Sequence, residues 1–179
     1  GYEIFLRDGA CGSALWDYLM DVGGPMGLKP GHTSSIRRIE AAMLSYHADM
    51  TLKNNPFELG MDRLVDLDME FDFVSKAALT RIRDEGVSQL QVGLVFDGAP
   101  ISGSNDEYWP VLVDGQKVGQ VTSAVYSPRL KQNIALALVA VAHAGIGTKA
   151  MIAMSGEPRG CEIVQKPFFD PKKAIAAKG

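Results

Sequence analysis

The second half of the chain consists of short apolar runs separated by turn residues, and this pattern restricts the possible folds more than any other feature. The runs lie at residues 89–96, 109–113, 116–123, 133–141, 149–154 and 161–165. Several short strands at this spacing are typical of a small antiparallel barrel or sandwich. We therefore expect a β-barrel domain at residues 88–170.

The pair Asp114-Gly115 lies between two of these runs, Trp109–Val113 and Gln116–Ser123. Asp-Gly accepts the positive φ angles of a type I′ turn, which joins two antiparallel strands with two residues. The sequence therefore predicts a β-hairpin with Asp114-Gly115 at its tip.

The first half mixes strand and helix signals. Tyr2–Arg7 is rich in β-forming residues and ends at a turn pair, Asp8-Gly9. Helices are predicted from Ser13 to the break at 23–25, over Ile36–Leu44 after N-cap candidates at 33–35, and over Phe73–Glu85 before Gly86. A strand followed by a helix fits an α+β layer.

We thus expect an α+β protein in three parts: a partial α+β region at residues 1–87, the barrel at 88–170, and a polar tail at 171–179. Because Tyr2–Arg7 has the pattern of an internal strand at the very start of the chain, we expect a C-terminal fragment whose N-terminal part is missing. The strand's partners would lie upstream, so the N-terminal half should expose apolar surface.

Composition excludes several classes of function. The net charge of −3 leaves no basic stripe to neutralise phosphates, so no nucleic-acid partner is expected. No apolar run approaches the ~18 to 20 residues that span a membrane. Cys11 and Cys161 are isolated, which favours free thiols in a reducing cytoplasm over a metal site.

Glu3 and the acidic residues 62–72 are the carboxylates with candidate roles. In a strand Glu3 shares a face with Phe5, where its carboxylate either meets solvent or accepts paired N–H donors from a heteroaromatic ligand. The acidic residues lack the glycine and terminal glutamate of a calcium loop, so a solvated face is the favoured interpretation and no metal is expected.

Four groups of motifs, in order along the chain, resemble the glycine-cleavage T-protein (aminomethyltransferase) family. They are Arg38–Tyr46 with Asp49-Met50 and Asn55–Gly60; Phe73–Leu79; Val118–Ser123 with Tyr126–Pro128 and Asn133–Ala137; and Lys166–Pro171. Within the family, the motif Ser-Tyr-x-x-Asp-Met at residues 45–50 and the sequence of residues 62–67 are most similar to those of dimethylsulfoniopropionate demethylases.

The resemblance implies a three-part ring around a folate channel. This chain would supply the end of the second part, a return segment and the C-terminal barrel. Its α+β region would then be the end of a ferredoxin-like layer. It implies a cytoplasmic tetrahydrofolate-dependent methyltransferase. The reaction would demethylate dimethylsulfoniopropionate to methylmercaptopropionate and methyl-tetrahydrofolate. Its partners would be the small-molecule methyl donor and the missing N-terminal part, and a homodimer is also considered.

The resemblance also implies site residues. The family's pterin-binding glutamate falls on Glu3, a folate-contacting arginine on Arg38, and a substrate-proximal aromatic on Phe5. A carboxylate suits this task, since it accepts two parallel N–H bonds from an aminopyrimidinone edge. The family's catalytic aspartate lies upstream, so no catalytic residue is assigned here and the isolated chain is expected to be inactive.

Two alternatives remain open. One keeps the cofactor and changes the donor: an aminomethyltransferase of the glycine cleavage system, or the folate domain of a sarcosine or dimethylglycine dehydrogenase. The other is a non-catalytic folate-binding protein of iron–sulphur-cluster assembly. Its family signature contains a cysteine, and the corresponding residues here, Asp72–Ala77, contain none.

Overall fold

The computed structural model describes residues 2–31, 33–172, 174 and 175, and it divides into two compact units. Unit 1 is Gly1–Thr33 and unit 2 is Ser34–Gly179. The boundary expected at residues 87 and 88 lies inside unit 2, where α3 joins β1. The expected tail at 171–179 falls largely outside the described residues.

Unit 1 is built around one helix, α1 (Gly12–Gly23), between the 3-10 turns η1 (Gly9–Cys11) and η2 (Gly24–Met26). The predicted helix and its glycine stop are confirmed. The predicted strand Tyr2–Arg7 is wrong: these residues have no strand pairing. A strand depends on hydrogen bonds to a neighbour, and the described residues offer this segment none.

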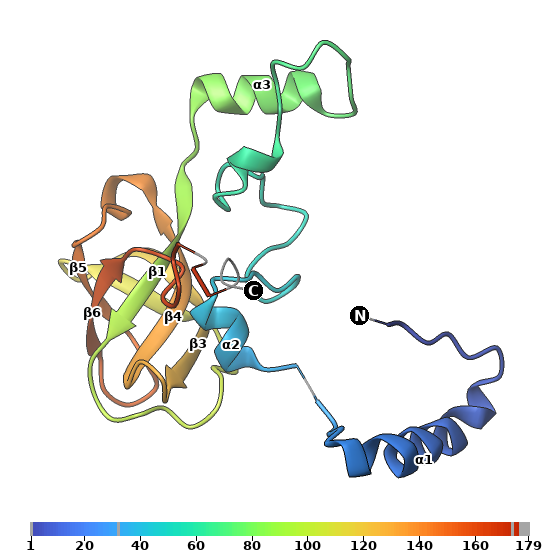
Figure 1. Cartoon of the computed structure of the whole chain (residues 1–179). Helices are drawn as coiled ribbons and strands as arrows, with labels where there is room; N and C mark the ends of the chain where they lie inside the picture. Colours follow the sequence, from blue (N-terminus) through green and yellow to red (C-terminus); the bar gives the residue numbers. More distant parts are fainter. Residues whose placement is uncertain (1, 32, 173, 176–179) are drawn as a thin grey trace. The chain divides into compact units, whose positions relative to one another are not determined.

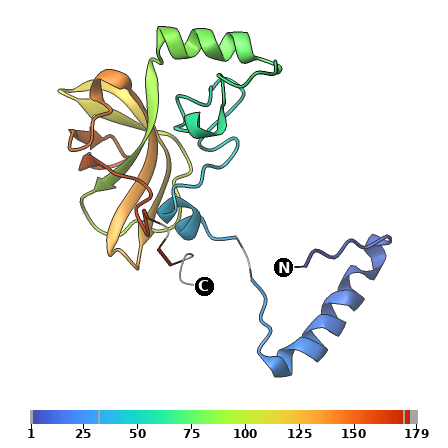
Figure 2. The ribbon, with the colours of Figure 1, turned by 45° about the horizontal axis from the view of Figure 1, so that its top comes forward.

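Unit 2 contains a closed antiparallel barrel, which confirms the predicted β domain (Figures 1 and 2). The strand order around the barrel is β1-β4-β3-β2-β5-β6. The strands are β1 (Gln89–Phe96), β2 (Trp109–Val113), β3 (Gln116–Ser127), β4 (Gln132–Ala140), β5 (Lys149–Ile152) and β6 (Arg159–Val164), and a 3-10 turn, η4 (Val141–His143), follows β4.

The β2–β3 hairpin forms as predicted. Asp114 (φ 50°) and Gly115 (φ 77°) both have positive φ, and β2 pairs with β3 on either side of them. Gly119 in β3 is required for a different reason. A Cβ there would lie 2.2 Å from the carbonyl oxygen of Leu138, so only glycine allows β3 and β4 to approach this closely.

Helix α2 (Ser35–Glu40) packs on the outside of the barrel against β3 and β4. Ile39 forms a buried cluster there with Val125, Ile134 and Leu136. The predicted N-cap is confirmed, since the Ser34 hydroxyl accepts from the backbone N–H of Arg37. The helix ends four residues before the predicted Leu44, and the following residues 41 and 42 form a turn instead of continuing it.

Residues 41–75, here called the connecting segment, run from α2 to α3 with one 3-10 turn, η3 (Asp62–Leu64). Helix α3 (Lys76–Glu85) begins three residues later than predicted, because Ser75 is in the left-handed region (φ 75°), and ends at Gly86 as predicted. No helix among the described residues is long and apolar enough to cross a membrane.

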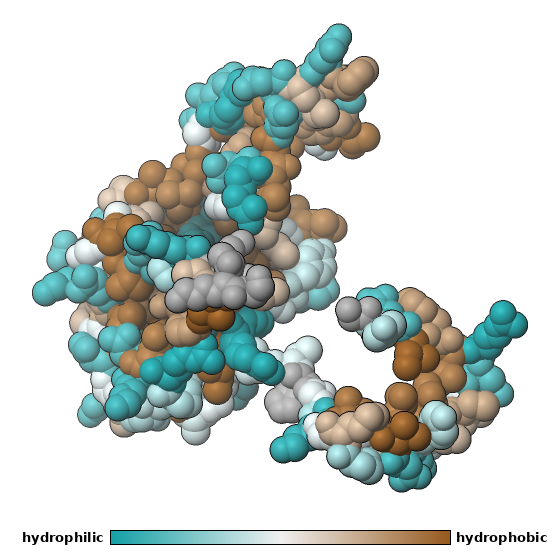
Figure 3. All heavy atoms as spheres, viewed as in Figure 1, coloured by the Kyte–Doolittle hydropathy of each residue, from teal (hydrophilic) through white to brown (hydrophobic). Residues whose placement is uncertain are grey.

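The expected exposure of apolar side chains in the N-terminal half is confirmed. Both units carry apolar residues at their surfaces (Figure 3). Those at least two-thirds exposed before β1 are Tyr2, Phe5, Met26, Leu52, Phe71 and Val74. On α1 of unit 1 the Trp16 side chain is 53% exposed, whereas Leu15 and Leu19 are half-buried.

Candidate functional site

A polar network surrounds Asp49, whose side chain is completely buried. Asp49 Oδ2 accepts hydrogen bonds from Arg38 Nη1 at 2.7 Å and from the backbone N–H of Ser45 at 2.9 Å. Arg38 Nη1 also donates to the carbonyl of Met43 at 3.2 Å. A buried carboxylate needs such partners, because desolvation without them costs several kcal/mol. We call residues 43–50 the clasped loop.

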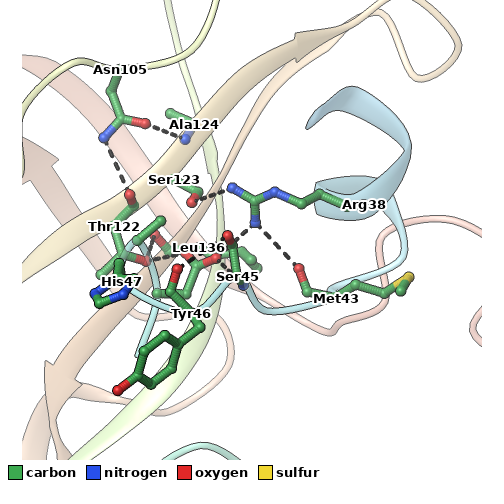
Figure 4. A network of polar contacts seen from close by, with 12 residues as sticks. Arg38, Met43, Ser45, Tyr46, His47, Asn105, Thr122, Ser123, Ala124 and Leu136 are labelled. Carbon is green, nitrogen blue, oxygen red and sulfur yellow. Dashed lines mark hydrogen bonds and ion pairs between the residues drawn. The ribbon is translucent and has the colours of Figure 1, made fainter. Parts of the chain in front are cut away.

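The barrel supplies the other half of this network (Figure 4). Thr122 Oγ1 donates to Asp49 Oδ1 at 2.6 Å, and Arg38 Nη2 donates to Ser123 Oγ at 2.7 Å. The Tyr108 hydroxyl lies 2.9 Å from the carbonyl oxygens of both His47 and Ala48. The clasped loop is therefore bound to β3 and to the loop before β2 by side chains, without β pairing.

The clasped loop presents two exposed rings, Tyr46 and His47, whose centroids lie 4.3 Å apart in an edge-to-face arrangement. His47 is in the left-handed region with φ 73°. Such a conformation costs a non-glycine residue about 1 to 2 kcal/mol. The contacts to Asp49 and Tyr108 hold the loop in this shape, with both rings turned away from the Arg38 guanidinium (Figure 4).

A second polar cluster holds the chain after β6. Buried Glu40 accepts from the Ser127 hydroxyl at 2.6 Å, and Arg129 lies 3.8 Å from its other oxygen. The Arg129 guanidinium also stacks 4.1 Å from the centre of the Phe169 ring, and the Phe169 N–H donates to the Glu40 carbonyl. The segment Lys166–Pro171 thus contacts α2 through Phe169.

Lys166 lies in a third polar contact, where its ammonium group donates to the backbone carbonyl and the side-chain oxygen of Gln91. Burial lowers the pKa of Lys166 to about 8, and the negative charge of Asp49 partly opposes this shift. The Gln91 Nε2 group is buried and has no hydrogen-bond partner among the described residues. The backbone N–H of Gln91 donates to the Glu58 carbonyl, which ties the connecting segment to β1.

The residues assigned by resemblance lie in different units. Glu3 and Phe5 belong to unit 1, where both are exposed, and no hydrogen bond from a described residue reaches the Glu3 carboxylate. Arg38 belongs to unit 2, and both of its terminal nitrogens bond within the chain. Its contact with folate stays a prediction. The sequence alone indicates no role for Asp49 or Thr122, because these partners lie 73 residues apart.

Cysteines and acidic residues offer no further chemical centre among the described residues. No three His, Cys, Asp or Glu side chains there are grouped to hold a metal ion. Both cysteines are free thiols, as expected. Cys11 is exposed, whereas burial raises the pKa of Cys161 to about 11 and keeps it protonated.

Two family models match the chain in order. The GCVT N-terminal domain matches residues 1–69, and the glycine cleavage T-protein C-terminal barrel domain matches residues 90–170. The chain belongs to the glycine cleavage T-protein family. The second match coincides closely with the closed barrel β1–β6, and Arg38 and Asp49 lie within the first.

The relatives of this chain include both aminomethyltransferases and a demethylase of the expected subfamily. An aminomethyltransferase from Synechococcus sp. (strain CC9902) is 38% identical over 88% of this chain and 42% of its own length. A second aminomethyltransferase, from Symbiobacterium thermophilum, is 34% identical over 94% of the chain and 44% of its own. Dimethylsulfoniopropionate demethylase DmdA of Ruegeria pomeroyi is 34% identical over 83% of the chain and 40% of its own.

A solved structure supports the fold. The glycine cleavage system aminomethyltransferase T from Bartonella henselae has a TM-score of 0.72 and 19% identity, and the match covers 90% of this chain and 45% of that one. The chain therefore spans under half the length of the relatives it matches.

Proposed function

We propose that this chain is part of a tetrahydrofolate-dependent aminomethyltransferase. The observation that carries the proposal is the ordered match of both family models, one of them on a closed barrel of matching extent. The aminomethyltransferase name of most relatives supports this donor over the sulfonium donor expected first. In such a reaction tetrahydrofolate supplies the nitrogen that accepts the one-carbon group.

The residues of the chain fit a folate unequally. The Glu3 carboxylate is exposed and without a partner among the described residues, so it is available to accept the N–H edge of a pterin. Arg38 has its terminal nitrogens bonded to Asp49, Met43 and Ser123. We therefore assign pterin binding to Glu3 and assign Arg38 to holding the clasped loop.

Demethylation of dimethylsulfoniopropionate is the second candidate, and the similarity to the Ruegeria pomeroyi demethylase favours it. Phe5 is 85% exposed, so its ring face is open to a sulfonium, an attraction worth about 0.5 to 2 kcal/mol. The two candidates differ in product. A sulfonium donor gives methyl-tetrahydrofolate, whereas an aminomethyl donor loses its nitrogen as ammonia and gives the methylene compound. Mass spectrometry of the folate product separates them.

The assignment of Glu3 is tested by calorimetric titration of tetrahydrofolate into the wild-type chain and the Glu3→Gln variant. Glutamine replaces one accepting oxygen with a donor, so the ligand's N–H groups lose a charged partner. We expect affinity to fall roughly ten- to a hundredfold, equivalent to about 1.4 to 2.8 kcal/mol.

Asp21→Asn is the matched control, since Asp21 is another exposed carboxylate of unit 1, and its affinity should equal that of the wild type. Equal affinity in Glu3→Gln would make Glu3 a solvated residue without a role in binding. Absence of tetrahydrofolate binding by the wild-type chain would contradict the proposal that these residues carry the folate site.

A further inference from the structure

A polar hollow of about 500 Å³ in unit 2 lies between the barrel and residues 48–54 of the connecting segment. All of its lining residues belong to unit 2, whereas Glu3 and Phe5 belong to unit 1. Its lining combines loop residues with residues of β1, β3 and β4 and of the loop before β2. They include Asp49, Lys53, Gln89, Tyr108, Lys117 and Gln120.

Two residues of the lining, Asp49 and Tyr108, already have hydrogen-bond partners that hold them in place. Asp49 accepts from Arg38, Ser45 and Thr122, so its charge is matched and its oxygens are occupied. The Tyr108 hydroxyl is bound to the carbonyls of the clasped loop. Side chains fixed this way lose little conformational freedom when a ligand binds in the hollow.

Other residues of the lining, in contrast, have unused donors, and among them Lys53 and Lys117 are exposed. The ammonium groups of Lys53 and Lys117 have no ion pair or hydrogen bond to any described residue, and neither do the amide groups of Gln89 and Gln120. Asp49 is the one acidic residue of the lining, and Arg38 neutralises it. The hollow is thus cationic on a chain whose net charge is −3.

A neighbouring hollow of about 350 Å³ limits what can bind. It shares Ala48, Tyr108 and Thr122 with the first and is lined by two acidic residues, Asp106 and Glu107. A long polyanion would be repelled where it passed Tyr108. The favoured ligand therefore has its negative charges close together on a small group.

We propose that the hollow between Lys53 and Lys117 is a binding site for a dicarboxylate group. Two ammonium groups match two carboxylates, and the amides of Gln89 and Gln120 add neutral N–H donors. The glutamyl end of a folate and a free dicarboxylate both carry this chemistry. The site itself does not depend on the proposed function; only its assignment to a folate's glutamyl end does.

The test is titration of glutarate into the wild-type chain at low salt, with a dissociation constant expected on the order of 1 mM. Lys53→Met and Lys117→Met should each weaken binding at least fivefold, with unchanged far-UV circular dichroism. Lys172→Met is the matched control, because Lys172 is exposed and outside the hollow. It should bind like the wild type, and the uncharged analogue glutaramide should not bind.

The site is refuted if glutarate does not bind, or if its affinity for both lysine variants equals its affinity for the wild type. It is also refuted if Lys172→Met weakens binding as much as Lys53→Met and Lys117→Met do. Tetrahydrofolate and tetrahydropteroate, which lacks the glutamyl group, separate the two sources. If the lysine variants bind tetrahydrofolate more weakly than the wild type does but bind tetrahydropteroate equally well, the ligand is the glutamyl end of the folate. Loss of glutarate binding with unchanged tetrahydrofolate affinity identifies a free dicarboxylate. Glutarate binding by a wild-type chain that binds no tetrahydrofolate would refute the proposed function and keep the site.

Discussion

The barrel and the connecting segment of unit 2 are stabilised in different ways. Barrel side chains such as Leu94, Val111, Ile134 and Ile152 are fully buried, and the strands form a continuous ladder around the barrel. The 35 residues at 41–75 bury only Asp49, Glu58 and Leu59, two of which are charged. The barrel therefore depends on many interchangeable apolar contacts, and the segment on a few specific polar ones.

This difference has a consequence for how each region responds to change. Loss of one apolar contact in the barrel leaves the others in place, and its effect is graded by the volume removed. Loss of Arg38 from the network around Asp49 leaves a buried carboxylate without its opposite charge, although the Ser45 N–H and the Thr122 hydroxyl still donate to it. The following substitutions test this contrast.

Arg38→Met should have the largest effect, because it leaves the buried Asp49 carboxylate without its ion pair. We expect a loss of about 3 to 5 kcal/mol in the free energy of unfolding, measured by urea denaturation. Arg83→Met is the control. Arg83 pairs with Asp84 and Asp68 at the surface, and its replacement should cost no more than about 1 kcal/mol.

Replacing both members of the buried pair, in Arg38→Met/Asp49→Leu, should cost less than the sum of the two single replacements. Equal effects of Arg38→Met and Arg83→Met on stability would break the comparison. Arg38 would then be free to act as the folate contact that the resemblance implied.

Leu136→Ala should lower the free energy of unfolding by about 2 to 5 kcal/mol, because it removes a side chain with no exposed surface. Val74→Ala in the connecting segment, where the side chain is 94% exposed, should change the free energy of unfolding by less than about 0.5 kcal/mol.

Amide hydrogen exchange tests the same contrast between the barrel and the connecting segment without substitution. We expect slow exchange in β1, β3 and β4 and fast exchange over residues 65–75. Similar exchange rates in both would mean that the segment has a core of its own.

Lys166 should give the smallest effect, a dependence of stability on pH. Its pKa is lowered from 10.5 to about 8 in the folded chain, so between these values the unfolded chain binds more protons. Stability therefore rises with pH through this window, by on the order of 1 kcal/mol for this partly exposed group.

The readout is the difference in unfolding free energy between the wild type and Lys166→Met from pH 7.5 to 10.5. This difference removes the opposite contribution of Cys161, whose raised pKa of about 11 lowers stability above pH 9. Lys172→Met should keep the wild-type rise. A flat difference would show that the folded chain leaves Lys166 solvated.

The sequence predicted the barrel well because its information is local. The limits of β1 follow from one apolar run and the hairpin from one dipeptide, Asp114-Gly115. The order of strands around the barrel was not predicted, because pairings such as β1 with β6 join residues far apart in the chain.

The site was less predictable for the same reason. Glu3 and Arg38 came from resemblance, and resemblance does not distinguish a ligand contact from a structural one. Ser-Tyr-x-x-Asp-Met at 45–50 favoured a demethylase as a sequence pattern. In the structure, its Asp49 accepts from the N–H of Ser45 and anchors the loop, so at least part of the motif has a structural explanation that is independent of the methyl donor.

The clasp around Asp49 also constrains how this chain can evolve in length. Asp49 Oδ2 bonds the N–H of Ser45, and Oδ1 meets Thr122 on β3, so inserting or deleting one residue between 45 and 49 would break one bond or the other. Residues 65–72 carry mostly exposed side chains and few contacts outside their own stretch. Among relatives of this chain, insertions and deletions should therefore accumulate at 65–72, while the spacing from 45 to 49 stays constant.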